Sequence, residues 1–214
     1  MLPFFQMAPV LWIGGSSHAL AFSKAFKAIK NLEFELRCFT KAGATFEVLE
    51  KLFPPVETFK EGDVLLLFVF GNDMFKKGSH QIERVGTQKI IHLKNFWPQT
   101  DDHLKSICVR IEEKLQGCPV KVVIVTSFYR HLTCCEAHKA LFPDLLKHQK
   151  KCNLLITNFF QKKANRIVLD HRSLLLGRRQ YDLKGYRERQ RDSVHFGSKD
   201  YENMAEKIRK KITE

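Results

Sequence analysis

Two kinds of apolar segment alternate along the chain. Short runs rich in β-branched and aromatic residues, bounded by Gly, Pro or polar positions, predict buried strands. Longer stretches with apolar residues three or four positions apart predict amphipathic helices. The predicted strands are residues 9–14, 32–39, 63–70, 120–126 and 165–170. The predicted helices are residues 19–29, 44–52, 104–115, 136–163 in two pieces, and 199–212.

Strands that alternate with helices predict an α/β protein. We expect a central parallel sheet of about five strands, covered on both faces by helices in a three-layer α/β/α arrangement with right-handed crossovers. Neither a linker nor an internal repeat interrupts the pattern, so residues 1–214 are interpreted as one domain. Sheets of this kind bind ligands beyond the carboxyl ends of their strands. The residues that follow each strand are therefore the candidates for a functional site.

The composition is compatible with a folded protein that has a sizeable core. Of the 214 residues, 44% are hydrophobic and 11% aromatic. The apolar run at 64–70 is too short to span a bilayer, which needs about 20 residues. Because the first predicted strand begins at residue 9, the uncharged N-terminus is not interpreted as a signal peptide. The six irregularly spaced cysteines are typical of free thiols, and together these features predict an intracellular protein.

Four short polar segments lie after predicted strands or before the last predicted helix. The first strand leads into Gly14-Gly15-Ser16-Ser17-His18 and the second into a segment with Gly43. The third strand ends at Gly71-Asn72-Asp73, and Asp192-Ser193-Val194-His195 precedes the last helix. Each segment alone is common, because Gly-Ser turns and Asn-Asp loops often have no chemical role. All four in this order, each beyond a predicted strand or just before the last helix, are much harder to assign to chance.

In this order the segments resemble the four sequence blocks of the SGNH (GDSL-type) serine hydrolases, from Val10 to Ile212. The last block, DSVHFGSKDYENMAEKI, resembles the family's Asp-x-x-His and the helix after it. KAGATFEVLEKL resembles the glycine block, and GND the asparagine block. Two positions depart from the family pattern. In WIGGSSH, Ser16 stands where the family usually has Asp. Before the GND segment, Phe70 stands where a glycine is frequent. The resemblance implies a flavodoxin-like SGNH hydrolase fold and an esterase or deacylase that needs no cofactor.

The resemblance also implies a role for each residue. Ser17 would attack the carbonyl carbon of a small acyl ester, with Ser16 as the alternative nucleophile. His195 would act as base and then as acid, and Asp192 would orient its ring. The oxyanion would be held by the backbone N–H groups of Ser17 and Gly43 and by the Asn72 side-chain amide.

The charge of the chain opens a second interpretation. The formal net charge is +13, and residues 147–191 contain thirteen Lys or Arg against three acids. Such a surface is either a solvated face or a site for RNA or another polyanion. The alternative function is therefore a catalytically weak or inactive SGNH-like module that binds nucleic acid. The candidate contact residues are Arg178, Arg179, Tyr181, Tyr186, Arg187, Arg189 and Arg191.

A cluster of potential metal ligands does not lead to a predicted metal site. Its members are His131, Cys134, Cys135, His138, His148 and Cys152. Two pairs in this stretch are four residues apart and would share a helix face. The spacing matches no zinc finger, so no metal is expected. The sequence does not determine the oligomeric state.

Overall fold

The structure is a computed structural model that describes residues 8–74, 80–85, 88–93, 100–130, 136–177, 182–191 and 194–214. Its centre is a five-stranded sheet with the order β2-β1-β3-β6-β7, in which all neighbouring strands are parallel. The strands are β1 (Val10–Gly15), β2 (Glu35–Thr40), β3 (Val64–Phe68), β6 (Lys121–Val125) and β7 (Arg166–Leu169). All five predicted strands are confirmed, with ends shifted by a few residues.

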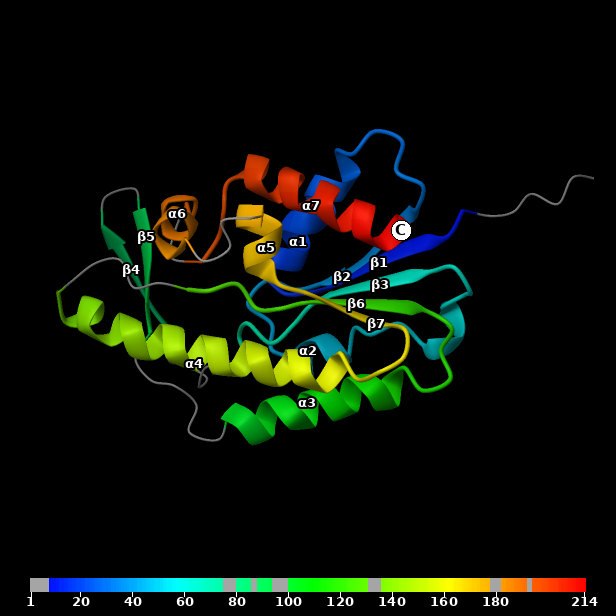
Figure 1. Cartoon of the computed structure of the whole chain (residues 1–214), viewed down its shortest axis with the longest axis horizontal. Coiled ribbons are helices and arrows are strands. Elements are labelled where there is room, and N and C mark those ends of the chain that lie inside the picture. The colour runs from blue at the N-terminus through cyan, green and yellow to red at the C-terminus, as the bar shows by residue number, and fades with distance from the viewer. Residues whose placement is uncertain are drawn as a thin grey trace, which may run out of the picture.

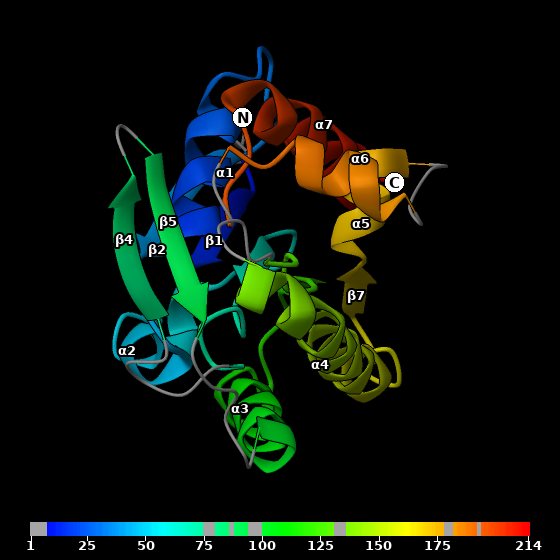
Figure 2. The ribbon, with the colours of Figure 1, turned by 90° about the vertical axis from the view of Figure 1, so that its left-hand side faces the viewer.

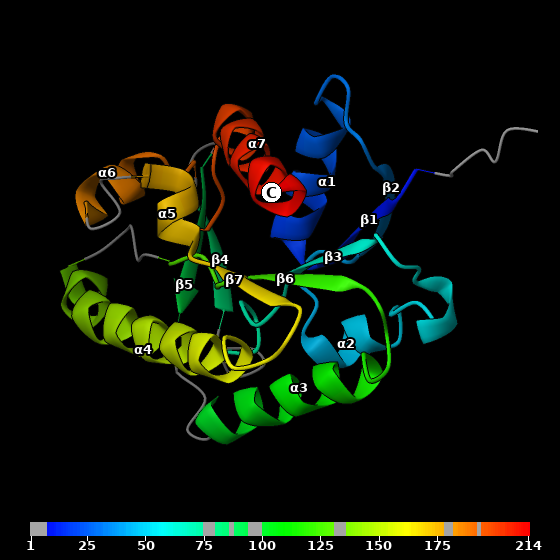
Figure 3. The same ribbon diagram turned by 45° about the vertical axis from the view of Figure 1, so that its right-hand side comes forward.

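Helices cover both faces of this sheet. One layer contains α1 (Ser17–Lys27), α5 (His171–Leu176) and α7 (Ser198–Thr213). The other layer contains α2 (Phe46–Glu50), α3 (Thr100–Lys114) and α4 (Glu136–Phe160). Figures 1 and 3 show the sheet between these two layers. The predicted three-layer α/β/α fold is confirmed.

The two hydrophobic cores follow from the alternation of side chains along the strands. Leu11 and Ile13 point into the core below α1 and α7, whereas Trp12 points into the core above α3 and α4. All five residues of the central strand β3 are buried, so both faces of this strand are packed. This is the reason that the segment Val64–Phe68 lacks polar positions.

The residues from Glu136 form one continuous helix, and the prediction of two pieces is wrong. Pro143 lies within α4 and removes one backbone N–H from the helical hydrogen bonds. The helix continues because one face beyond the proline packs into the core. Leu145, Cys152, Ile156 and Phe160 repeat at helical spacing on that face, and each is at most 1% exposed. Burial of this face outweighs the lost hydrogen bond.

Several short elements were not predicted. They are the 3-10 turn at Val56–Thr58, the helices α5 (His171–Leu176) and α6 (Leu183–Glu188), and the antiparallel hairpin of β4 (His80–Val85) and β5 (Gln88–Leu93). The hairpin and α6 lie near the edge of the sheet where the parallel strands end (Figures 1 and 2). No helix among the described residues is long and apolar enough to cross a membrane.

Candidate active site

A sharp turn between β1 and α1 places Ser17 at the carboxyl edge of the sheet. Gly15, the last residue of β1, has a φ of 145°. A Cβ atom there would lie 2.3 Å from the carbonyl oxygen of Phe68 on the neighbouring strand, so only glycine fits. After Ser16 the chain enters α1 directly at Ser17. The hydroxyl of Ser17 therefore lies in the first helical turn, where the backbone N–H groups have no partner within the helix.

His195 meets Ser17 although 178 residues separate them in the sequence. Its Nε2 atom lies 2.9 Å from the Oγ atom of Ser17, which is hydrogen-bond distance. Local pairing supports the position of the histidine, because the backbone N–H of Arg191 donates to the carbonyl of His195 over 2.7 Å. Gln190 and Phe196 form an antiparallel bridge around the same turn. The arrangement can transfer a proton from the hydroxyl to the imidazole.

A groove of about 370 Å³ opens beside Ser17 and His195. One wall comes from α1 through Leu20, Ala21 and Lys24, which lie on the same helix face as Ser17. The opposite wall comes from the start of α7. Leu20 is 40% exposed there, which is unusual for a large aliphatic side chain in this protein. The remaining lining residues are Ala25, Arg191, Phe196, Ser198, Tyr201 and Glu202.

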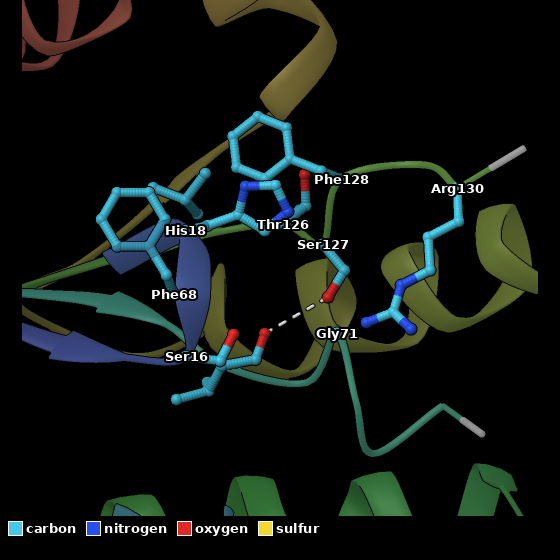
Figure 4. Close-up of a pocket in the computed structure, with 10 residues that line it drawn as sticks. Ser16, His18, Phe68, Gly71, Thr126, Ser127, Phe128 and Arg130 are labelled. Atoms are coloured by element: carbon cyan, nitrogen blue, oxygen red, sulfur yellow. Dashed lines mark hydrogen bonds between the residues drawn. The ribbon is translucent and has the colours of Figure 1, made fainter. Parts of the chain in front are cut away.

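Ser16 lies in a different pocket from His195. It is 7% exposed and lines a narrow pocket of about 10 Å³ together with His18, Ser127 and Arg130. Figure 4 shows Ser16 on one side of this pocket and the guanidinium of Arg130 on the other. The imidazole of His195 is not among the residues that line it. Of the two serines, Ser17 is thus the one whose hydroxyl is placed beside the imidazole of His195.

Gly43 and Asn72, two of the three residues predicted to stabilise an oxyanion, lie on neighbouring loops. The side-chain Nδ2 of Asn72 donates to the carbonyl of Ala44 over 2.8 Å. This bond joins Asn72 to the turn that contains Gly43. Gly43 has a φ of 72°, which favours glycine, and no heavy atom lies within 4 Å of the position of a Cβ. Its backbone N–H thus belongs to an open turn beside the asparagine.

The backbone conformation of Phe70 accounts for one departure from the family pattern. It stands where a glycine is frequent, and its φ of 75° is a value that side chains rarely adopt. The backbone therefore keeps the conformation of a glycine. The side chain is fully buried, and its ring centroid lies 6.4 Å from that of Phe160. Burial of the aromatic ring offsets the cost of the strained backbone.

Several predicted residues lie outside the described part of the chain. They are Asp192, the proposed partner of His195, and the candidate contact residues Arg178, Arg179 and Tyr181. Arg187, Arg189 and Arg191 are described and are exposed. Arg189 forms an ion pair of 2.8 Å with Asp200.

The prediction that Tyr186 is a contact residue for nucleic acid is wrong. Tyr186 lies in α6 rather than in a polar loop, and it is 2% exposed. Its hydroxyl accepts a hydrogen bond from the backbone N–H of Tyr129 over 3.0 Å. Burial also raises the pKa of this phenol well above its usual value. The helical turn at 183–188 directs the ring into the core, which the polar neighbours of Tyr186 in the sequence do not reveal.

The potential metal ligands do not form a described cluster. His131, Cys134, Cys135 and the side chain of His138 lie outside the described residues. The Nε2 atom of His148 lies 3.0 Å from the carbonyl of Met74. Over the part of the chain that the structure describes, no three His, Cys, Asp or Glu side chains are arranged to hold a metal ion.

Sequence analysis missed one residue of this region. Arg130 is 7% exposed, and its Nη2 atom donates to Oδ1 of Asn72 over 2.7 Å. It follows the predicted strand 120–126, and the same rule about carboxyl ends of strands would have pointed to it. The segment after that strand contains none of the family's sequence blocks, so the resemblance did not indicate Arg130.

The chain shares its fold, a parallel sheet in this order between two helical layers, with several solved structures of esterases and GDSL-type lipolytic proteins. The acetylxylan esterase Axe2 from Geobacillus stearothermophilus superposes with a TM-score of 0.61 at 11% identity, over 96% of this chain and 94% of that one. A member of the lipolytic protein G-D-S-L family from Veillonella parvula gives 0.61 at 13% identity, over 95% and 97%. The acetyl xylan esterase AlAXEase gives 0.58 at 20% identity, over 94% and 97%.

Comparisons of the sequence itself give no match. A scan against protein-family models finds none, and a search of curated proteins finds no similar sequence. At identities of 11–20%, the structural likeness shows the fold.

Proposed function

We propose that this protein is a serine hydrolase that cleaves carboxylic esters, with Ser17 as the nucleophile and His195 as the general base. One observation supports this more than any other: Ser17 Oγ and His195 Nε2 lie 2.9 Å apart at the carboxyl edge of the sheet. A serine hydroxyl becomes a strong nucleophile when a base at this distance takes its proton. The lipolytic and esterase activities that name the solved neighbours support the same class of reaction.

The proposed reaction has two halves. Ser17 Oγ attacks the ester carbonyl carbon while its proton moves to Nε2 of His195. The tetrahedral intermediate then collapses, the bond to the alcohol oxygen breaks, and His195 gives the proton to the departing alcohol. Water attacks the acyl-serine in the second half, with His195 again as base, and releases the carboxylic acid. Asp192 is proposed to accept a hydrogen bond from the other ring nitrogen and to stabilise the imidazolium.

The proposed oxyanion hole consists of donors from three loops. The backbone N–H of Ser17 comes from the start of α1, and that of Gly43 comes from the turn after β2. The Asn72 amide already donates one N–H to Ala44, so its second N–H is the one proposed to face the oxyanion. Loss of one such donor typically lowers kcat by about 10²–10³-fold.

The groove beside Ser17 is proposed to take the acyl group. Leu20, Ala21 and Phe196 supply apolar walls for it, and its volume of about 370 Å³ suits a short chain. Among the described residues that line the same groove, Lys24 and Arg191 are cationic and Glu202 is acidic. We therefore expect faster hydrolysis of esters with neutral, short acyl chains than of esters with cationic ones.

The test is covalent labelling together with hydrolysis. Wild-type protein should react with a fluorophosphonate probe and hydrolyse p-nitrophenyl acetate or butyrate. Ser17→Ala and His195→Ala should abolish both signals, whereas the matched control Ser16→Ala should keep labelling. Labelling that survives Ser17→Ala, or that disappears only in Ser16→Ala, would refute the assignment of the nucleophile.

Binding of a polyanion is a second candidate function, and it is compatible with the first. Arg187, Arg189 and Arg191 are exposed, and Arg191 lines the groove that contains Ser17. A bound RNA would therefore approach the catalytic edge of the sheet. Single-stranded RNA should bind with an affinity that falls steeply with salt. Replacement of Arg187 and Arg191 by Gln should reduce that salt slope by about one for each lost phosphate contact. An unchanged slope would argue against this surface.

A further inference from the structure

The loop that follows β6 is fixed by side chains rather than by neighbouring backbone. Asn153 of α4 accepts from the N–H of Ser127 over 3.0 Å and donates to the carbonyl of Ser127 over 2.9 Å. One turn earlier, Gln149 accepts from the N–H of Arg130 over 2.8 Å and donates to its carbonyl over 3.2 Å. Both amide side chains are buried. Each amide side chain bonds both the N–H and the carbonyl of one residue, as a neighbouring strand would. The two ends of the segment 127–130 are therefore held against α4.

The middle of the same loop is held from the other side of the sheet. The hydroxyl of Tyr186 accepts from the backbone N–H of Tyr129 over 3.0 Å. Gln190 donates to the carbonyl of Tyr129 over 2.7 Å. Four side chains from α4, α6 and the turn after α6 thus bind the backbone of residues 127–130 in this loop. Such a loop has little conformational freedom, and its side chains are delivered to defined positions.

This rigid loop directs Arg130 toward the candidate oxyanion donor. The guanidinium extends into the narrow pocket opposite Ser16 and lies close to Gly71, as Figure 4 shows. Its Nη2 atom reaches Oδ1 of Asn72 over 2.7 Å, a short bond of the charge-assisted kind. The hydroxyl of Ser127 bonds the Val69 carbonyl over 3.2 Å and so ties the same loop to the end of β3.

The bond from Arg130 fixes the plane of the Asn72 side chain. A primary amide is planar and has one oxygen and two N–H groups. Arg130 binds the oxygen and the carbonyl of Ala44 binds one N–H, over 2.7 Å and 2.8 Å. With these two positions fixed, the direction of the remaining N–H is determined, and the amide cannot flip. The positive charge on the oxygen side also polarises the amide and makes that N–H a stronger donor.

We propose that Arg130 is a positioning residue that holds Asn72 in the orientation needed to stabilise the oxyanion. This inference rests on the proposed hydrolase function and assigns to that site a residue outside the four sequence blocks. In this proposal Arg130 acts through Asn72 rather than directly on the substrate. Its loss should therefore affect the transition state far more than binding of the ester.

Kinetics of ester hydrolysis test the coupling. Arg130→Met should lower kcat by about 10–100-fold and change KM by less than about twofold. Asn72→Ala should lower kcat by about 10²–10³-fold. In the Asn72→Ala background, Arg130→Met should add less than about a twofold effect, because its target is gone. Arg209→Met, an arginine paired with Glu206 on α7, is the matched control and should leave kcat unchanged. Independent, multiplying effects of the two variants would overturn the proposal.

A measurement that needs no activity separates this proposal from the hydrolase function. The Asn72 side-chain amide gives two proton resonances in a ¹⁵N-correlation spectrum, assigned by their loss in Asn72→Ala. Arg130→Met should speed hydrogen exchange of this amide by at least about tenfold, because the amide becomes free to rotate. Arg130→Lys keeps the charge without the planar fork, and it should give an intermediate exchange rate if the Met variant does not fold. An unchanged exchange rate of the Asn72 amide in both variants would refute the positioning role of Arg130. A wild-type protein that is inactive but keeps slow exchange of this amide would refute only the hydrolase function.

Discussion

The buried imidazole of His171 predicts a specific pH dependence of stability. His171 is 1% exposed and packs edge-on against Tyr129, with ring centroids 4.4 Å apart. Its Nδ1 atom lies 2.8 Å from the hydroxyl oxygen of Thr126, and Nε2 has no hydrogen-bond partner among the described residues. Burial lowers the pKa of this histidine from 6.5 to about 3, against the opposing attraction of Asp170. The ring is therefore neutral in the folded protein at any pH above about 3.

The magnitude follows from the difference between the folded and unfolded pKa. As the pH falls below 6.5, the unfolded chain takes up a proton at His171 and the folded chain does not. Protonation therefore favours unfolding, and the free energy of unfolding falls by about 1.4 kcal/mol per pH unit until the pH reaches about 3. Between pH 7.5 and pH 5.0 this one residue should cost about 2 kcal/mol of stability.

The perturbation is His171→Phe, which keeps a ring of similar size and removes the titration. Urea unfolding at pH 7.5, 6.5, 5.5 and 5.0 gives the free energy of unfolding, with the fluorescence of the buried Trp12 as one probe. The difference between wild type and variant should change by about 2 kcal/mol over this range, in favour of the variant at low pH. His171→Asn, which can still bond Thr126, should give the same trend. Parallel stability curves for wild type and both variants would refute the neutral, buried imidazole.

Three further substitutions test other parts of the argument. Gly15→Ala should lower the free energy of unfolding by at least about 3 kcal/mol, measured in urea, because the new Cβ would meet the Phe68 carbonyl; a stable variant would contradict the tight turn. Asp63→Ala should lower the melting temperature through loss of about 3 kcal/mol, since its carboxylate accepts from the Val10 backbone N–H and from the Trp12 indole; Asp63→Asn should cost less. Asn153→Ala should cost about 2 kcal/mol and lower kcat, and an unchanged kcat would show that the loop after β6 does not influence the site.

The sequence predicted the architecture because that architecture follows from local periodicity. The apolar run at Val64–Phe68 has no polar position, which is typical of a parallel strand that is buried on both faces. The amphipathic repeat at 199–212 likewise predicted α7, whose apolar residues are buried. The division of α4 into two pieces was wrong, because local propensity does not include the packing that keeps the helix continuous through Pro143.

The candidate site was predicted only in part. Ser17 and His195 were paired through the family resemblance, and the structure brings them within 2.9 Å. The role of Asp192 stays a prediction because this residue lies outside the described part of the chain. Tyr186 was expected at the surface, since its neighbours are polar, but α6 turns its ring inward.

The sequence by itself thus determined which segments form the central sheet and the main helices beside it, and in what order the polar segments follow them. Tertiary structure decided which of those polar groups meet. The choice between Ser16 and Ser17 depends on the directions of their side chains at the start of α1. These directions follow from the turn of the backbone at Gly15. The contact between Arg130 and Asn72 joins loops 58 residues apart, and no local pattern records it. The periodicity of apolar residues indicates which face of one helix or strand is buried. A site depends on distances between residues of different elements, and these distances are set only when the elements pack around the sheet.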